Sequence, residues 1–198
     1  MNIKINMTQL VMIMIIVYVS YRYMNSDWAN LKCIIADKNG KRYCVRDRNN
    51  IDDAANLLAS AVEIMKKLVN YVGKKYPDDE RVIRLVKGFN AERISETLPT
   101  SEHTAYSENK GEKIAFCLNK KSNHDKKLID LNTLVFVSIH ELAHVMTESI
   151  GHKPEFWANM KFLLENAVEI KVYTPVDYSV DNEVYCGDPI TNNPLFDE

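Results

Sequence analysis

The most informative part of this chain is "HELAHVMTESIGHKPEFW", residues 140–157, which holds three of its five histidines. The segment before it, "DLNTLVFVSI" at 130–139, carries apolar residues at the three-and-four spacing typical of a helix. Asp130 or Asn132 can cap the start of that helix. Gly151 is a natural stop, because glycine adopts a left-handed conformation at little cost. The pattern predicts one amphipathic helix that carries the first two histidines.

On such a helix, His140 and His144 stand one turn apart on the same face. Two imidazoles so placed can bind one zinc ion, with Glu141 beside the open side of the metal. Zinc lowers the pKa of bound water to about 7, and a carboxylate can then accept its proton. Two histidines four residues apart also occur on unrelated helices, but the apolar Leu142 and Ala143 favour a helix facing the core.

Two residues compete for the place of a third metal ligand. If the helix continued, His152 would lie about 12 Å beyond His144 along the axis and could not share its metal. A left-handed residue at Gly151 would reverse the chain and bring His152 back. Glu165 has 20 residues between it and His144, a spacing that suits a thermolysin-like arrangement. Glu165 can equally be a solvated residue of a later helix.

"HELAH" followed by "GHKPEFW" resembles the SprT-like and WLM groups of zincin metallopeptidases. The preceding "TAYSENKGEKIAFCLN" is similar to the hairpin before their active-site helix, so the resemblance covers about residues 100–170. It implies Zn²⁺ bound by His140, His144 and His152, with Glu141 as the general base. It also implies that the strand in "KIAFCLN" lies beside the cleft and hydrogen-bonds the substrate backbone. Lys153 departs from the glycine that often follows the third histidine, which affects the shape of the loop more than the ligands.

The N-terminal segment differs from the rest of the chain. Residues 10–19, "LVMIMIIVYV", contain no polar side chain. A membrane span of about 20 residues becomes possible over 3–23, with Lys4 and Arg22 reaching the interface. A cleaved signal peptide fits less well, because Tyr18 is not small where a cleavage site near Ser20 would need a small residue. We therefore expect a single-pass anchor, and the lysines and arginines after it favour the domain on the cytosolic side.

Length and charge limit the number of domains and the kinds of binding partner that the chain can have. The chain has 198 residues, 25 basic and 27 acidic side chains and a net charge of −2. This length suits one domain, and the charge provides no overall attraction to nucleic acid. Basic runs at 38–48 and 119–127 are typical of solvated loops, so nucleic-acid binding is left as a lesser alternative.

The four cysteines leave the redox compartment open. Asn39-Gly40 is a strong hairpin signal between Cys33 and Cys44. A two-residue turn would place these cysteines diagonally, at about 7–8 Å, too far for an unstrained disulfide. A four-residue loop over 37–40 would place them opposite and permit one. Free thiols are the simpler expectation, and Cys117 is expected in the core.

Helices are predicted at 51–76, with Asp52 or Asp53 as cap, at about 78–88, and from Pro154 to about Ile170. Residues 90–102 are expected to form a loop, and 104–107 and 112–118 two strands. The apolar stripe of the last helix is expected to be core and comprises Phe156, Trp157, Met160, Leu164 and Val168. In the turn-rich tail, Tyr173, Tyr178 and Tyr185 are expected to pack, although one of them could donate to an oxyanion.

These features predict an α+β fold, a zincin-like metallopeptidase domain with a small antiparallel sheet packed on helices, preceded by one transmembrane helix. The anchor would occupy 1–24 and the domain 25–198, with the active-site core at about 100–170 and a tail at 171–198. The predicted function is that of a membrane-anchored zinc endopeptidase acting on protein or peptide substrates. The alternative is a zinc-stabilised binding or structural membrane protein of the same fold.

Overall fold

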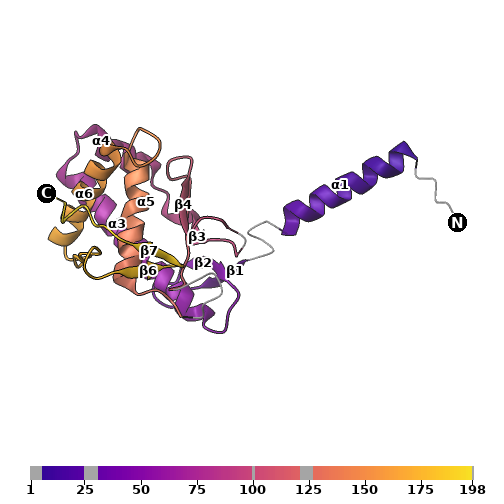
Figure 1. Cartoon of the computed structure of the whole chain (residues 1–198), viewed down its shortest axis with the longest axis horizontal. Helices are drawn as coiled ribbons and strands as arrows, with labels where there is room; N and C mark the ends of the chain where they lie inside the picture. The colour runs from indigo at the N-terminus through magenta and orange to yellow at the C-terminus, as the bar shows by residue number, and fades with distance from the viewer. Residues whose placement is uncertain (1–5, 25–30, 100, 121–126, 198) are drawn as a thin grey trace.

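The computed structural model describes residues 6–24, 31–99, 101–120 and 127–197. It has an α+β architecture, in which helices pack together on one side of a small sheet (Figure 1). The N-terminal helix α1 (Met7–Met24) precedes the domain, and all its residues are exposed to solvent. Lys4 and Ile3, at the start of the predicted span, and residues 121–126 of the second basic run lie outside the described residues.

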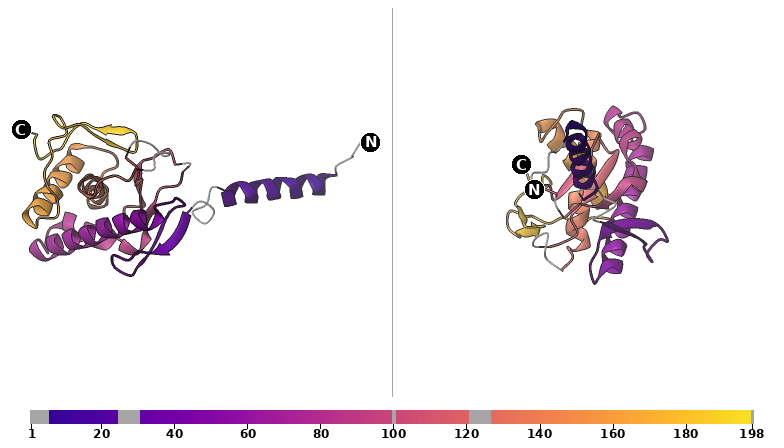
Figure 2. Two further views of the ribbon diagram at one scale, coloured as in Figure 1. Left: turned by 90° about the horizontal axis from the view of Figure 1, so that it is seen from below. Right: turned by 90° about the vertical axis from the view of Figure 1, so that its right-hand side faces the viewer.

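The helix α5 (Leu131–Met146) lies at the centre of the domain. Twelve of its sixteen residues are buried, so it is a core helix rather than a surface one. It packs against α3 (Ile51–Lys75), α4 (Glu80–Gly88) and α6 (Pro154–Glu169). Seen nearly end-on in the left view of Figure 2, α5 has α3, α6 and the C-terminal segment around it. This burial from several sides makes α5 a rigid platform.

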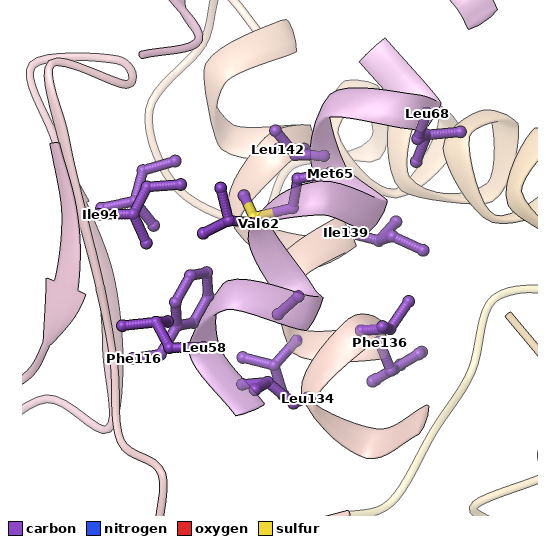
Figure 3. Packing of buried hydrophobic residues seen from close by; sticks show 14 of the residues in the cluster. Leu58, Val62, Met65, Leu68, Ile94, Phe116, Leu134, Phe136, Ile139 and Leu142 are labelled. Atoms are coloured by element: carbon purple, nitrogen blue, oxygen red, sulfur yellow. The ribbon is translucent and has the colours of Figure 1, made fainter. Parts of the chain in front are cut away.

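The contact between α3 and α5 contains much of the hydrophobic core. Figure 3 shows Leu58, Val62 and Met65 of α3 facing Leu134, Ile139 and Leu142 of α5. Asn50, rather than Asp52 or Asp53, occupies the position before α3, so the predicted cap was wrong by two or three residues. The two aspartates lie in the first turn instead, where their charge complements the helix dipole.

The sheet beside α5 has three strands in the order β3-β5-β4: β3 (Ile94–Glu96), β5 (Lys113–Phe116) and β4 (Ala105–Glu108). The predicted hairpin of β4 and β5 is confirmed. β3 was missed, because we expected residues 90–102 to form a loop. In the structure these residues contain the short 3₁₀ helix Ala91–Arg93 and then β3. β3 runs parallel to β5, so the sheet is mixed and not purely antiparallel as predicted.

A second sheet is formed by the hairpin of β1 (Leu31–Ile35) and β2 (Arg42–Arg46). Its turn is the four-residue loop 37–40, closed by hydrogen bonds between Ala36 and Lys41 and between Ala36 and Gly40. This loop places Cys33 opposite Cys44, and the two form a disulfide. The expectation of free thiols was therefore wrong.

The C-terminal segment crosses the domain near α5 (Figure 2). Its hairpin consists of β6 (Glu183–Tyr185) and β7 (Asp188–Ile190), which we call the C-terminal hairpin. A second disulfide joins Cys186 in its turn to Cys117, which directly follows β5. Cys117 is buried, as predicted, but not as a free thiol. This covalent link fixes the hairpin to the central strand of the sheet.

Candidate metal site and cleft

The first two histidines of the candidate site owe their positions to α5. Asp130 caps the helix, as predicted, and accepts hydrogen bonds from the backbone N–H of Thr133 at 2.9 Å and from its hydroxyl at 2.7 Å. With the start fixed, His140 and His144 fall one turn apart, and their Nε2 atoms lie 3.2 Å from each other. The helical period alone accounts for this pairing.

His152 joins the pair through the segment 147–153, which we call the connection. The helix ends at Met146 rather than at Gly151, because the connection begins with Thr147 in an extended conformation. Gly151 does adopt the predicted left-handed conformation, with φ of 82°. His152 Nε2 then lies 3.1 Å from Nε2 of both His140 and His144. Glu165 is exposed on α6 and lies outside this cluster.

Side chains from three other elements hold the connection, and no local sequence pattern predicts them. Arg84 of α4 donates to the carbonyl of Met146 at 2.6 Å. Lys110 donates to the carbonyls of Thr147 and Ser149 at 2.8 and 3.0 Å. The carbonyls of Met146 and Thr147 lie at the C-terminal end of α5, where a helix leaves such groups unpaired and carries partial negative charge, so the two cations are well placed there.

The helix α6 holds the same segment from the other side. The Glu155 carboxylate accepts from the backbone N–H groups of Glu148 and Ser149 at 3.0 and 3.2 Å. The buried Asn159 amide donates to the Thr147 hydroxyl at 2.9 Å. Hydrogen bonds therefore hold residues 146–149 from both sides. His152 lies only three residues further along the chain, so its position depends on these bonds.

Lys110, which bonds the connection, lies in the turn between β4 and β5. Lys110 has φ of 56° and Gly111 φ of 101°. A Cβ on Gly111 would lie 2.5 Å from the carbonyl oxygen of Gly88 at the end of α4. Only glycine permits that approach, so the tight packing of α4 on this turn brings Lys110 within reach of the connection.

Phe156 packs against the rings of all three histidines. Its ring centroid lies 4.8 Å from that of His140, 4.4 Å from that of His144 and 4.6 Å from that of His152. Phe156 is buried, in agreement with the predicted apolar stripe of α6. Trp157 departs from that stripe, because it is 38% exposed and lies at the edge of the site, 5.7 Å from the His152 ring.

The imidazoles on α5 favour the neutral form. Burial, together with the neighbouring histidines, lowers the pKa of His140 to about 3. Burial also lowers the pKa of His144 to about 4, with smaller effects from His152 and Lys110. Neutral imidazole is the form that binds a metal ion, so these two rings need not lose a proton at pH 7.

The three nitrogens match the dimensions of a zinc site. A tetrahedral ion with Zn–N bonds of about 2.0–2.1 Å requires ligand nitrogens about 3.3 Å apart. The observed separations of 3.1 to 3.2 Å form a nearly equilateral triangle close to that size. His140, His144 and His152 could therefore hold one zinc ion and leave a fourth position open.

Glu141 has an unusual environment for a carboxylate. It is only 3% exposed, and its Oε2 has no hydrogen-bond partner within the described part of the chain. Burial raises its pKa to about 8. A buried polar atom without a partner is costly in a folded protein, so Glu141 is suited to hydrogen-bond a molecule that enters the site.

A cavity of about 430 Å³ opens beside the triangle. One wall is β4, which supplies Ala105, Tyr106 and Ser107, and the other is formed by the histidines with Ile150 and Gly151. β4 is an edge strand, whereas β5 pairs on both sides. The expectation that "KIAFCLN" faces the cleft was thus wrong, because that segment forms the central strand and β4 lies between it and the cavity.

The three tyrosines of the tail differ in their distance from the site. Tyr173 and Tyr178 are buried against Phe136, with ring centroids 6.0 and 4.8 Å from it, as expected for packing residues. Tyr185 is also buried, and its hydroxyl donates to the carbonyl of Thr104 at 3.2 Å. Burial raises its pKa well above the usual value, and the nearby Glu141 charge adds to that effect. Tyr185 is the tyrosine that approaches the site.

Comparison with known proteins identifies the class of this domain. Residues 54–193 match the WLM domain, a family of zincin-like metallopeptidase domains that resembles the SprT-like group. The chain belongs to the WLM domain family. This result confirms the resemblance that the histidine motif suggested.

The similar proteins are viral. The chain is 26% identical over 189 residues to "Uncharacterized protein R325" of Acanthamoeba polyphaga mimivirus, covering 93% of both chains. It is 36% identical to "Uncharacterized protein 136R" of Invertebrate iridescent virus 6, over 37% of this chain and 40% of that protein. It is 39% identical to "Uncharacterized protein 042R" of Invertebrate iridescent virus 3, over 37% of this chain and 49% of that protein. No solved structure matches it.

Proposed function

We propose that this protein is a zinc endopeptidase that hydrolyses peptide bonds in protein or peptide substrates. The observation that carries the proposal is the triangle of three imidazole nitrogens beside a buried, unpartnered carboxylate oxygen, at the wall of an open cavity. Membership of the WLM family supports it. A structural zinc site is normally closed by four protein ligands, whereas the residues that the structure describes offer three here.

In this proposal His140, His144 and His152 hold the metal and Glu141 moves the proton. Zinc, when bound, would polarise the scissile carbonyl and lower the pKa of water. Glu141 accepts the proton of the attacking water through its free Oε2 and passes it to the leaving amine. Burial raises the pKa of Glu141 to about 8, which is close to the neutral pH at which an efficient proton-transfer group should titrate.

The edge of β4 would bind the substrate backbone. An extended peptide can add to an exposed strand edge through main-chain hydrogen bonds, and β4 is the strand that lines the cavity. We assign no oxyanion donor, since the Tyr185 hydroxyl is directed at Thr104.

The decisive experiment replaces Glu141 with Gln in the full chain. We expect one zinc per chain in both proteins, and proteolysis of unfolded protein substrates by the wild type alone, because Gln cannot accept the proton. Glu165→Gln makes the same change of charge at an exposed site of α6 and should leave zinc and activity intact.

The outcomes separate the alternatives. Full activity of Glu141→Gln would refute the assignment of the general base. Zinc binding without proteolysis in the wild type would favour the zinc-stabilised binding or structural protein instead, and a wild type without zinc would refute both.

We further propose that α1 anchors the protein in a membrane. Among the described helices, α1 is long and apolar enough to cross a bilayer, and none of its residues is buried. The two disulfides indicate on which side of the membrane the domain lies more directly than the charges that flank α1. Disulfides persist in oxidising compartments, so we place the domain away from the reducing cytosol, contrary to the orientation that the sequence favoured.

Membrane attachment is tested by fractionation. The full chain should stay with membranes after carbonate washing, whereas a chain beginning near Asp27 should be soluble and still bind zinc. Recovery of the full chain in the soluble fraction, or a mature N-terminus after Ser20, would refute the anchor.

A further inference from the structure

A second cavity, of about 730 Å³, lies between the β1–β2 hairpin and the three-stranded sheet, and we call it the sheet cavity. It is larger than the cavity of about 430 Å³ beside the histidines, which we call the metal-site cavity. None of the three histidines of the triangle lines the sheet cavity. It is therefore a separate site, formed by strands and by the turn between β4 and β5.

The two cavities meet at the end of β4. Asn109, the first residue of the β4–β5 turn, lines both of them. Residues 105–107 of β4 line the metal-site cavity, whereas Glu108, the last residue of β4, lines the sheet cavity. A peptide paired along β4 therefore leaves the metal-site cavity at Glu108 and reaches the sheet cavity across the turn.

The walls of the sheet cavity are held in place before a ligand enters. The β1–β2 hairpin is closed by the disulfide between Cys33 and Cys44, and both cysteines line the cavity. The backbone N–H of Arg46 on β2 donates to the Glu96 carboxylate of β3 at 2.7 Å, and both residues are buried. This contact fixes the hairpin to the three-stranded sheet, so the cavity between them does not have to form on binding.

The buried part of the lining is mostly apolar. Leu31 of β1 and Ile94 of β3 are buried and line the cavity together with the disulfide. Ser95 of β3 lines it too, and its buried Oγ has no hydrogen-bond partner within the described part of the chain. Because a buried hydroxyl without a partner is costly, Ser95 is suited to bind a polar group that enters the cavity.

The more exposed part of the lining is charged. It contains three carboxylates and two cations: Glu92, Glu108, Glu112, Arg93 and Lys113. Lys41 pairs with Glu92 at 2.8 Å and Arg93 with Glu112 at 2.9 Å, and Lys113 is engaged in an interaction of its own. The exposed Glu108 carboxylate has neither an ion pair nor a hydrogen bond to any residue that the structure describes. Glu108 therefore presents a negative charge where the two cavities meet.

We propose that the sheet cavity is an exosite for the polypeptide substrate and binds a lysine or arginine that lies roughly three to five residues from the scissile bond, the reach of a strand as short as β4. The proposal rests on the peptidase function proposed above. The aliphatic stem of the basic side chain would cover the apolar wall while its cationic head reaches Glu108. An acidic side chain at this place would be repelled by Glu108.

The distance of this contact from the reacting atoms predicts its kinetic effect. An interaction made outside the reacting centre is present in the bound substrate and in the transition state alike. Such uniform binding lowers KM and leaves kcat unchanged.

A cleavage profile of the full-length protein on a peptide library derived from a whole proteome is the first test. Lys and Arg should be enriched at one position beyond the two that flank the scissile bond. In matched synthetic peptides, replacing that residue with Glu should raise KM about fivefold, as expected for an exposed ion pair, and leave kcat unchanged. Cleavage without any preference beyond the flanking positions, or an effect confined to kcat, would overturn the exosite and leave the peptidase function standing.

A reversal of charge locates the preference in the cavity. Glu108→Lys should reverse it, so that Glu is favoured at the distal position. Glu165→Lys makes the same change of charge at an exposed site of α6 and should leave the preference as it is in the wild type. Zinc content and melting temperature show that both variants are folded. If the sheet cavity were instead an interface between two copies of this chain, Glu108→Lys would change the oligomeric state in size-exclusion chromatography without changing the preference, and the exosite would be refuted.

A binding measurement separates the exosite from turnover. The probes are two fluorescein-labelled peptides of equal length, identical except that one carries lysines where the other carries glutamates. Fluorescence anisotropy with zinc-loaded Glu141→Gln should show tighter binding of the lysine peptide. The difference should vanish when Glu108→Lys is added to this variant and persist when Glu165→Lys is added. Such binding without any cleavage by the wild type would sustain the site for basic peptides and refute the peptidase, whereas equal affinity for both peptides would refute the exosite.

Discussion

The helix α5 and the connection after it contribute histidines to the same triangle, but they position them by different physical means. His140 and His144 are fixed by the period of one buried helix, so any fold that keeps α5 keeps their spacing. His152 is positioned by hydrogen bonds that hold the connection. Some come from α6, which follows the connection directly, and the others come from α4 and the β4–β5 turn, which lie much earlier in the sequence. One arrangement is local, and the other depends on tertiary structure.

This difference determines how each part can fail. Removing one contact barely disturbs a helix with twelve buried residues, because its other contacts remain. The connection has no regular backbone ladder, so each lost side chain removes a sizeable share of what holds it. Substitutions around the connection should therefore affect zinc binding more than their effect on stability suggests.

The largest expected effect concerns the third ligand. His152→Ala should lower zinc affinity by orders of magnitude, and His140→Ala should do the same, because a tetrahedral site with two protein ligands is incomplete. Glu165→Ala should leave zinc affinity unchanged, since this residue is exposed on α6 away from the triangle. Competition with a chromogenic chelator measures the affinity, and circular dichroism verifies the fold. Loss of zinc from Glu165→Ala together with its retention in His152→Ala would reverse the ligand assignment.

A smaller effect is expected at Asn159, which binds the Thr147 hydroxyl and accepts from Arg81 at 3.1 Å. Asn159→Ala should weaken zinc binding by about 10-fold, in the range typical of residues that orient metal ligands. It should also cost about 1–3 kcal/mol of stability, because buried partners are left unsatisfied.

Asn166→Ala is the matched control for Asn159→Ala. Asn166 is buried in the same helix, but its amide donates to the carbonyl of Phe162 at 2.8 Å and does not touch the connection. Stability should therefore fall in both variants, while zinc affinity should fall only in Asn159→Ala. An equal fall in zinc affinity would mean that α6 acts as a whole rather than through its contact with Thr147.

The same contrast explains which features the sequence could predict. The helix, its cap at Asp130 and the spacing of its histidines follow from local pattern, and the structure has all three. Gly151 indicated a reversal of the chain, although it could not show that the helix ends five residues earlier. Arg84, Lys110 and Asn159 have no local signature, because their roles depend on which elements meet in the fold.

The sheet and the tail show the same limit. β3 has three residues and pairs in parallel with a strand that follows it by about twenty positions, so no turn signal marks it. The assignment of "KIAFCLN" to the cleft failed for a related reason, since strand order within a sheet is a tertiary property. The disulfide between Cys117 and Cys186 spans 69 residues of sequence, and only the fold brings its ends together.

The smallest expected effects come from two carboxylates whose pKa values shift in opposite directions. Glu141 of the helix has a pKa raised to about 8 by burial. Glu155, which holds the connection, has a lowered pKa, chiefly through the neighbouring Ser149 side chain and through the hydrogen bonds that its carboxylate accepts from the backbone N–H groups of Glu148 and Ser149. In the metal-free protein, the folded state binds the Glu141 proton more tightly than the unfolded state does, so stability falls as pH rises from about 4.5 to about 8. For Glu155 the sign is reversed, and its contribution is present at neutral pH and lost as pH falls through the lowered pKa.

Thermal unfolding of the metal-free protein tests both signs. Glu141→Gln should raise the melting temperature at pH 9 by more than about 2 °C, because an uncharged side chain no longer has to be buried as an anion. At pH 4 it should have little effect, since Glu141 is protonated in both states. Glu155→Gln should lower the melting temperature slightly at pH 7, and this loss should shrink as the pH is lowered toward 3. A Glu141→Gln variant that is less stable than the wild type at pH 9 would mean that the buried carboxylate has a favourable partner in the metal-free protein, and its role as a group waiting for an incoming molecule would have to be abandoned.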